Sequence, residues 1–411
     1  MKDLKHMIYF ESLLQDAHND LVRKAQDSGK IALGYTCFHM PEVLLNLGDC
    51  FSVRLRAPNM GSMDIATYYM ASSSCEYSRA LLERSIEGNY KFLDAMAGVD
   101  LCESMNRCME NMELLETNDT SKKNFFWTNL DVPCSDDEDS VLHIREQLSR
   151  KLLKNLNEKY GVDVSDAAIR KSVEEHNKVC RLITEIGNFR KQINPVITGS
   201  EFHKICLVSF VVPKVDIIPY LEETLEELKT READKKNHYR ARVLVIGSEI
   251  DDPEMIELIE DSGALVVADR FCYGSIPGRQ EILLNDKEDA LTQVCRINLL
   301  QTECPRQCAK HKVTYRHDHA AELAKEYHAD GVIYEQMKFC TYWSYERTLA
   351  SYVMNNEKGI PTLSIDRPYR SGQSGQLRTR VQAFVESIEI KNIKARKEAR
   401  MGKTTQAEGE L

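Results

Sequence analysis

The sequence lacks the long apolar segments that membrane proteins need. Its 411 residues contain no run of about 18 apolar residues, so we expect no transmembrane helix. Residues 1–11 carry acidic side chains within their apolar stretch and have no signal-peptide hydrophobic region. We therefore expect a cytoplasmic protein without a membrane partner.

Positive charge is also scarce. Lysine and arginine number 54 against 64 acidic residues, and the formal net charge is −10 at pH 7. A general nucleic-acid binder needs a basic face to neutralise phosphates, so this class of protein is excluded. Basic side chains do gather near the C-terminus, in a tail (391–411) that we expect to fray in solvent.

Two nucleotide-binding motifs are absent. The sequence has neither the Gly-x-x-x-x-Gly-Lys-Ser/Thr phosphate loop nor the Gly-x-Gly-x-x-Gly dinucleotide fingerprint. We therefore expect that the chain itself does not hydrolyse ATP and has no classical nicotinamide site. Gly247 and Ser248 follow a strong strand pattern and offer backbone N–H groups to an anion, although a tight turn explains them equally well.

Cysteine, in contrast, is plentiful. Thirteen cysteines in a reducing compartment are not expected to form structural disulfides, so metal binding, catalysis or burial must account for them. Cys304, Cys308 and His311 have spacings found in some zinc sites, but no second Cys/His pair lies nearby. This absence argues against zinc. Cys108 is expected to lie on a helix, either buried or half-exposed.

Strand-like segments alternate with helical ones, which favours parallel sheets. We expect an α/β fold of two doubly wound, Rossmann-like lobes with a helical insert and an N-terminal helix. The residues between 127 and 139 are expected to form an acidic loop at a domain boundary. The expected parts are an N-terminal helical segment (1–30), a first lobe (31–135), a helical insert (136–235), a second lobe (236–390) and the basic tail (391–411).

Three cysteines occupy equivalent places in this pattern. Cys75, Cys102 and Cys340 each come directly before an expected helix. In an open α/β sheet, the strand-to-helix junctions lie at the edge where binding sites form. A single such cysteine is explained by burial, whereas three favour a shared site. His39 follows the strand that ends at Cys37, so a proton-transfer role and a structural role both stay open.

Several segments, taken in order, resemble the 2-hydroxyacyl-CoA dehydratase / benzoyl-CoA reductase family across nearly the whole chain. They are 34–42 (GYTCFHMPE), 75–79 (CEYSR), 102–107 (CESMNR), 245–248 (VIGS), 268–275 (ADRFCYGS), 338–340 (KFC), 359–361 (GIP) and 375–384 (GQLRTRVQAF). No single segment decides the resemblance. Their joint order and spacing carry it.

The resemblance implies one 4Fe–4S cluster per subunit, held by three cysteines with one iron left open. The matching positions here are Cys75, Cys102 and Cys340. It also implies a heterodimer with a related dehydratase subunit, an acyl-CoA substrate and a separate ATP-dependent iron–sulfur activator protein. The implied activity is that of a lyase. One added electron turns the thioester into a ketyl radical, water leaves and the electron returns, while the open iron acts as a Lewis acid.

Other residues receive roles by their place near these segments. His39 and Glu42 are the candidate catalytic residues for proton transfer, although Glu42 also suits the first turn of a helix. Arg79 and Lys338 flank two of the cysteines and are candidates to bind cluster sulfides or CoA phosphates, or serve as ordinary capping and ion-pair residues. Cys37 is a candidate for a fourth, substrate-side thiol.

Two alternatives to the dehydratase stay open. One is a subunit of a benzoyl-CoA reductase or of a double-cubane reductase, in which Cys304 and Cys308 would take part. The other is a non-catalytic electron-relay partner whose cluster never meets substrate.

Overall fold

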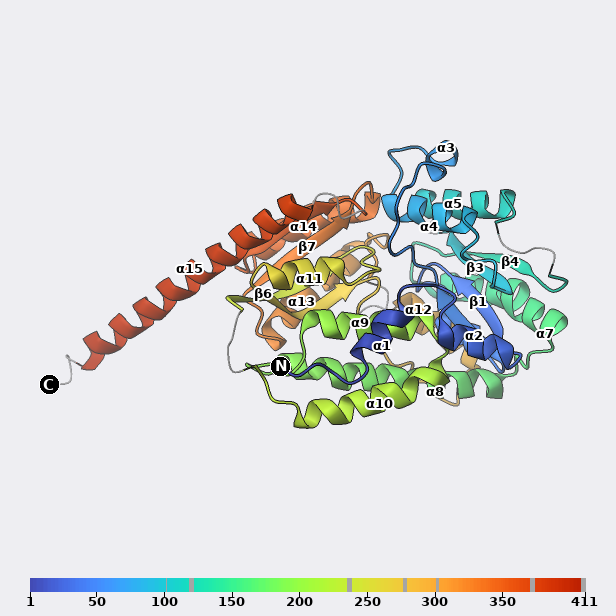
Figure 1. The fold of residues 1–411 in the computed structure, drawn as a ribbon, viewed down its shortest axis with the longest axis horizontal. Coiled ribbons are helices and arrows are strands. Elements are labelled where there is room, and N and C mark those ends of the chain that lie inside the picture. Colours follow the sequence, from blue (N-terminus) through green and yellow to red (C-terminus); the bar gives the residue numbers. More distant parts are fainter. Residues whose placement is uncertain are drawn as a thin grey trace.

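The fold is built on two four-stranded parallel sheets, one in each lobe (Figure 1). The computed structural model describes residues 1–100, 102–117, 122–234, 239–275, 279–300, 303–369 and 374–407. The first sheet has the order β2-β1-β3-β4 and the second the order β6-β5-β7-β8. The first-lobe strands are β1 (Ile31–Tyr35), β2 (Cys50–Arg54), β3 (Ala95–Asp100) and β4 (Phe126–Asp131). The second-lobe strands are β5 (Ala241–Gly247), β6 (Ala264–Phe271), β7 (Gly331–Met337) and β8 (Thr362–Arg367).

This architecture confirms the predicted α/β class with two doubly wound lobes. Every strand pairing in both sheets is parallel. Strands β2, β6 and β7 are buried along their whole length, as expected for parallel strands that helices cover on both faces.

The N-terminal segment forms two short helices, α1 (Met7–Leu13) and α2 (Asp20–Asp27), and not the single helix predicted for residues 1–30. Asn19 begins the second helix, because its side-chain oxygen accepts hydrogen bonds from the N–H groups of Leu21 and Val22, each at 3.1 Å. The apolar periodicity was real, but it belongs to two helices that a cap separates.

The insert is helical, and two of its helices run side by side under both sheets (Figure 1). Ser165 caps the longer of the two, since its hydroxyl accepts a hydrogen bond from the N–H of Ala168 at 3.3 Å. The insert elements are α6 (Glu138–Gln147), the π-helical η2 (Leu148–Leu153), α7 (Lys154–Tyr160), α8 (Asp166–Asn188), the 3-10 helix η3 (Phe189–Lys191), α9 (Gly199–Val211) and α10 (Lys214–Thr230). The paired helices are α8 and α10.

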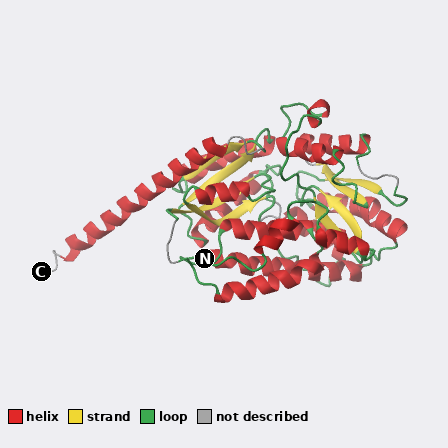
Figure 2. Ribbon diagram, in the orientation of Figure 1, coloured by secondary structure: helices red, strands yellow, loops and turns green. Residues whose placement is uncertain are grey.

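The remaining helices cover the sheets (Figure 2). In the first lobe they are the 3-10 helix η1 (Glu42–Asn46), α3 (Ala66–Tyr69), α4 (Glu76–Ile86) and α5 (Glu103–Leu114). In the second lobe they are α11 (Glu254–Asp261), α12 (Ala290–Leu300), α13 (Lys310–Glu326), α14 (Thr341–Asn356) and α15 (Ser374–Ala407). None of the helices in the described residues combines the length and the apolar character that a bilayer crossing requires.

Three elements differ from the sequence predictions. Strand β4 occupies the first part of the expected loop at 127–139, where Phe126, Thr128 and Leu130 alternate into the core. Helix α13 was missed because its buried face includes charged residues such as Arg316, which hide the apolar period. Helix α15 continues to Ala407, so the backbone between 391 and 407 is helical where a frayed tail was expected.

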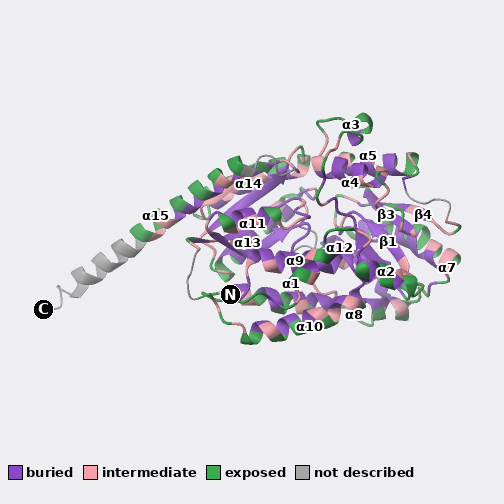
Figure 3. Ribbon diagram, in the orientation of Figure 1, coloured by how far each residue is buried: buried purple, intermediate pink, exposed green. Residues whose placement is uncertain are grey.

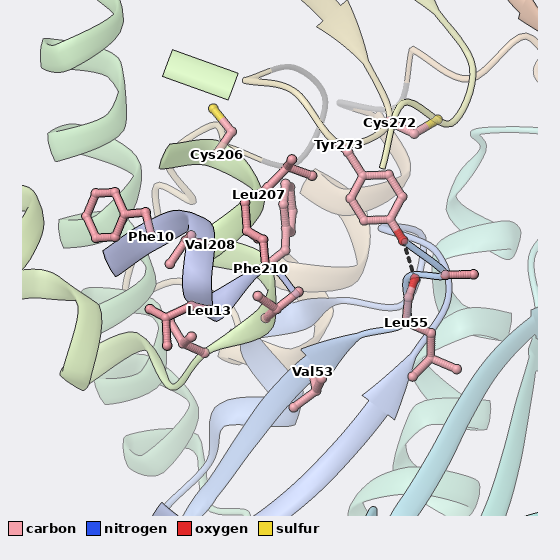
Figure 4. Close-up of a cluster of buried hydrophobic side chains, with 14 of the residues drawn as sticks. Phe10, Leu13, Val53, Leu55, Cys206, Leu207, Val208, Phe210, Cys272 and Tyr273 are labelled. Carbon is pink, nitrogen blue, oxygen red and sulfur yellow. Dashed lines mark hydrogen bonds between the residues drawn. The ribbon is translucent and has the colours of Figure 1, made fainter. Parts of the chain in front are cut away.

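Helix α9 joins the two lobes through one buried core (Figure 3). Phe210 of α9 packs near Val53 of β2 and Phe10 of α1 (Figure 4). From the second lobe, Tyr273 enters the same cluster and its hydroxyl donates a hydrogen bond to the carbonyl oxygen of Leu55. The lobes are therefore packed against each other through shared apolar contacts, which holds the edges of their sheets in a defined relation.

Candidate functional site

The three predicted cysteines occupy the same structural position in three different helices. Cys75 is the N-cap residue of α4, Cys102 of α5 and Cys340 of α14. A helix N-terminus carries partial positive charge and unpaired N–H groups, and both favour a thiolate. Short strand-to-helix connections place Cys102 after β3 and Cys340 after β7, whereas a longer segment that includes α3 leads from β2 to Cys75.

Backbone contacts bring the three starts together. The N–H of Cys75 donates to the hydroxyl of Ser104 at 3.3 Å, which ties it to the α5 start. The N–H of Glu76 donates to the carbonyl oxygen of Lys338 at 3.3 Å, which ties it to the α14 start. Segments from both lobes therefore meet at Cys75.

The thiols are protected from water. Burial raises the pKa of Cys75 to about 12, while the backbone N–H groups of Ser78 and Tyr77 favour its thiolate. Burial likewise raises the pKa of Cys102 and that of Cys340. Without metal these groups are neutral thiols at pH 7, and a bound metal would have to displace their protons.

The three candidate ligands are all cysteine thiols, the side chains that iron–sulfur clusters take as ligands. Within the described residues, no three metal-binding side chains lie close enough to hold one metal ion. A cubane carries irons at separate corners, so its thiolates stand further apart than the ligands of one ion. The zinc alternative has no support here, since Cys308 is exposed and His311 pairs with Asp136 at 3.3 Å.

The connection to Cys340 is strained. Phe339 has a φ angle of 66°, in the left-handed region that bulky residues avoid. The N–H of Cys340 bonds the carbonyl oxygen of Met337 at 2.9 Å and closes this turn. Strain of this kind persists where the surrounding structure imposes it, often at functional sites.

The two basic residues that flank the cysteines have local contacts. The Arg79 guanidinium donates to Ser74 and Thr67, each at 3.4 Å, and lies 3.7 Å from Glu76. The ammonium of Lys338 lies 5.5 Å from the centre of the Phe339 ring. These contacts fit the capping and ion-pair alternative, and a role toward cluster or CoA stays a prediction.

His39 is buried, and its ring stacks on Phe38 with a centroid distance of 4.6 Å. Burial, together with the charge of Arg306, lowers the pKa of His39 to about 3. The imidazole is therefore neutral at pH 7 and is not in the protonated imidazolium form that would act as a general acid. Its role in proton transfer stays a prediction.

Glu42 sits in a buried ion network. Its carboxylate lies 2.6 Å from the Lys214 ammonium and 2.9 Å from the Arg279 guanidinium, and accepts from the Tyr35 hydroxyl at 2.8 Å. Burial alone would raise the pKa of Glu42, but Lys214 and Arg279 hold it well below its ordinary value. A carboxylate fixed in this way suits a structural anion, and these contacts argue against the proton-transfer role predicted for it.

Sequence reasoning missed Glu249, which follows the turn at Gly247 and Ser248. The N–H of Ser248 donates to the Glu335 carboxylate at 3.0 Å, so this turn serves an internal contact. Glu249 lies 3.6 Å from Arg54. Burial raises the pKa of Glu249 to about 7, even though Arg54 opposes the rise.

Glu249 lies within electrostatic range of several cysteine thiols. Its charge acts on the thiols of Cys75 and Cys102, and also on those of Cys37 and Cys272. The sequence signal that could have identified Glu249 is its position just past the carboxyl end of β5, at the sheet edge where binding sites form.

Removing this carboxyl group should change the pH dependence of stability. A raised pKa means that the folded state holds the proton more tightly than the unfolded state, so folding becomes less favourable as the proton is lost. In iron-free protein, the stability of the wild type relative to Glu249→Gln should fall by about 1–3 kcal/mol between pH 4.5 and 7. Urea unfolding at pH 5 and pH 8 measures this difference. The control is Glu185→Gln, on the exposed face of α8; an equal pH effect there would refute the assignment to Glu249.

Residues 37–388 match the family model described as 2-hydroxyglutaryl-CoA dehydratase, D-component. The match spans both lobes, the insert and all three cysteines. The chain belongs to this family. The sequence was predicted to resemble the 2-hydroxyacyl-CoA dehydratase / benzoyl-CoA reductase family. This match to a dehydratase family confirms that prediction.

Known relatives of the family cover most of the chain. It is 21% identical to the beta subunit of (R)-phenyllactyl-CoA dehydratase from Clostridium sporogenes, over 92% of this chain and 97% of that one. It is 22% identical to the beta subunit of (R)-2-hydroxyglutaryl-CoA dehydratase from Acidaminococcus fermentans, over 90% and 95%. A putative dehydratase subunit of Escherichia coli, YjiM, is 24% identical over 73% of this chain and 75% of its own length.

Proposed function

We propose that the chain is the iron–sulfur subunit of a 2-hydroxyacyl-CoA dehydratase, a lyase that removes water from a 2-hydroxyacyl-CoA. The observation that carries the proposal is that Cys75, Cys102 and Cys340 cap three helices, and that the start of α4 contacts the segments at the starts of α5 and α14. Several relatives are dehydratase subunits, which supports the same reading. Their names also support a related subunit as partner.

Cys75, Cys102 and Cys340 would hold one 4Fe–4S cluster. When bound, it would supply the single electron that lets the acyl-CoA lose water through a ketyl radical. The three helix N-termini favour the thiolate form of the ligands, and burial keeps water away from them. The proposed partners are a related subunit, an ATP-dependent iron–sulfur activator protein and an acyl-CoA.

Metal content tests this proposal. In anaerobically purified protein we expect about four irons and four sulfides per chain, lost in Cys102→Ala. Cys295→Ala is the matched control, because Cys295 is buried in α12 with Arg145 and Asp289 as its charged neighbours. Zinc in place of iron, or equal iron in both variants, would refute the cluster assignment.

Reductant consumption separates the dehydratase from a reductase. With its partner subunit and activator, a dehydratase should turn over many substrate molecules for each electron supplied. Consumption of reductant in proportion to product would instead favour the benzoyl-CoA or double-cubane reductase alternative.

A further inference from the structure

Two cavities adjoin each other along helix α11. The larger has a volume of about 770 Å³ and the smaller a volume of about 200 Å³. Both are lined by Asp252, Glu254, Pro368 and Tyr369, so they form one groove, which we call the α11 groove. Six carboxyl groups line it, those of Glu11, Glu76, Asp252, Glu254, Glu257 and Asp261.

This lining keeps an excess of negative charge. Lys204 is shared between two of the carboxylates, those of Glu11 at 2.6 Å and Glu257 at 2.8 Å. Among the described residues, neither Asp252 nor Glu254 has a basic group within 4.0 Å. Burial and the charge of Asp251 raise the pKa of Asp252 to about 6. The groove therefore favours a cationic ligand.

A buried donor lines the same groove. Arg56 lines the larger cavity and is only 6% exposed. Its Nε–H donates to the carbonyl oxygen of Asp251, and its Nη1–H donates to that of Leu14 at 3.2 Å. Its Nη2 has no hydrogen-bond partner within the part of the chain that the structure describes. An unpaired donor beside two that bind carbonyl oxygens fits a third carbonyl oxygen, such as a peptide ligand supplies.

The chain itself carries a segment of opposite charge. Residues 391–411 hold six basic and three acidic side chains, a net charge of +3, so the formal charge of −10 leaves −13 on residues 1–390. The six basic residues lie between Lys391 and Lys403 in the last part of α15, and we call residues 390–403 the basic segment. The family model ends at residue 388, so membership of the family gives this segment no role.

The basic segment leaves the body of its own chain. Val381 and Ile388 of α15 are buried against the second lobe, whereas Ile390 is 55% and Ile393 46% exposed. Figure 1 shows this end of α15 extending away from both lobes. Its apolar side chains are therefore available to pack against another molecule.

The basic segment does not reach the groove of its own chain. Leu377 and Arg378, at the start of α15, line the smaller cavity. In one continuous helix, Lys394 lies roughly 24 Å and Lys403 roughly 38 Å further along the axis than Arg378. A groove that this segment enters must belong to a second molecule.

We propose that the basic segment of one copy of this chain binds in the α11 groove of a second copy. The lysine and arginine side chains would meet the carboxylates of Glu254 and Asp261, and the two exposed isoleucines would pack against Leu258 and Leu377. Two such contacts related by a two-fold axis would close a dimer. This contact does not depend on the proposed iron–sulfur cluster.

Other anionic partners fit the basic segment less well. A helix that lies on a membrane presents a broad face of large apolar side chains. Between 390 and 403 the sequence holds only Ile390, Ile393 and Met401 of this kind, and no aromatic residue. A nucleic acid would be repelled by the negative charge of residues 1–390.

Sedimentation velocity of the full chain tests the proposal. In about 0.05 M salt we expect a dimer of the 47.1 kDa chain, which dissociates in about 0.5 M salt because salt screens exposed charges. The double variant Lys391→Glu with Lys394→Glu should associate about tenfold more weakly or less. The control is Lys171→Glu with Lys287→Glu, which changes the net charge equally at exposed sites elsewhere and should behave as wild type.

Exchange of charges between the two sides locates the contact. The groove variant, Glu254→Lys with Asp261→Lys, should also be monomeric, because its groove repels the basic segment. An equal mixture of the groove variant with Lys391→Glu, Lys394→Glu should dimerise again, since both contacts then join opposite charges. Restored association also shows that both variants are folded.

The other outcomes overturn the proposal. A monomeric wild type, or a dimer that the segment variant leaves intact, would exclude the basic segment as the contact. A mixture that stays monomeric would exclude the α11 groove. A monomeric wild type that binds vesicles of acidic phospholipid would assign the segment to a membrane surface instead. None of these outcomes changes the iron content, so the proposed function is tested separately.

Discussion

Glu42→Gln is expected to lower the free energy of unfolding by about 3–5 kcal/mol, because it removes the charge that two buried cations share. Lys214 and Arg279 both contact the Glu42 carboxylate, and both side chains are almost fully buried. Burial lowers the pKa of Lys214 to about 8, although Glu42 opposes this shift. Without the carboxylate, Lys214 would have to lose its proton or remain charged in an apolar site. Either course costs folding free energy.

Urea unfolding of iron-free protein at pH 7 measures this loss. The control is Glu146→Gln, whose carboxylate pairs with Arg150 at 3.0 Å on an exposed surface and should change stability by less than about 1 kcal/mol. Because the folded pKa of Glu42 is depressed, its contribution should be present above about pH 4.5 and be lost at lower pH. If Glu42→Gln were as stable as wild type but inactive, the predicted catalytic role would be favoured over the structural one.

Glu346→Gln is expected to cost a similar 3–5 kcal/mol or so, since it leaves a buried arginine without its counter-charge. The Glu346 carboxylate accepts two hydrogen bonds from Arg316, at 3.0 Å and 2.7 Å. Burial would raise the pKa of Glu346, but His317 and Arg316 overcome it and lower the pKa to about 2.

The pH dependence of this effect has a defined sign. The difference in unfolding free energy between wild type and Glu346→Gln should have its full value above about pH 4.5. It should disappear as the pH falls toward 2. Glu110→Gln is the control, since Glu110 pairs with Arg107 at 3.0 Å on the exposed side of α5. Equal stability losses in both variants at pH 7 would contradict the assignment of the effect to burial.

The architecture could be predicted from the sequence because the patterns that indicate strands and helix starts are local. The apolar runs of β5 and β7 and the helix starts at Cys75, Cys102 and Cys340 are visible in short windows. Parallel connection then places successive strand-to-helix junctions at one edge of a sheet, so three distant cysteines were expected to share a site. Elements with weak local signals, such as α13 with its buried Arg316, were missed.

The roles of single polar residues depended on contacts that no local window contains. Glu42 was predicted to transfer protons from its place near the sheet edge, but Lys214 from α10 and Arg279 from the second lobe neutralise it. Burial raises the pKa of Glu249 to about 7, although Arg54 from the first lobe opposes the rise. Lys214, Arg279 and Arg54 each lie more than a hundred residues from the carboxylate that they contact.

By itself, then, the sequence determined the α/β lobes, the family and the three cysteines at helix starts, because periodicity, capping and junction position are encoded by near neighbours. The tertiary structure alone decided that Lys214 and Arg279 hold the Glu42 carboxylate and that burial raises the pKa of Glu249 to about 7. Electrostatic environment and burial are set by every group packed around a side chain, and the fold draws those groups from distant parts of the chain.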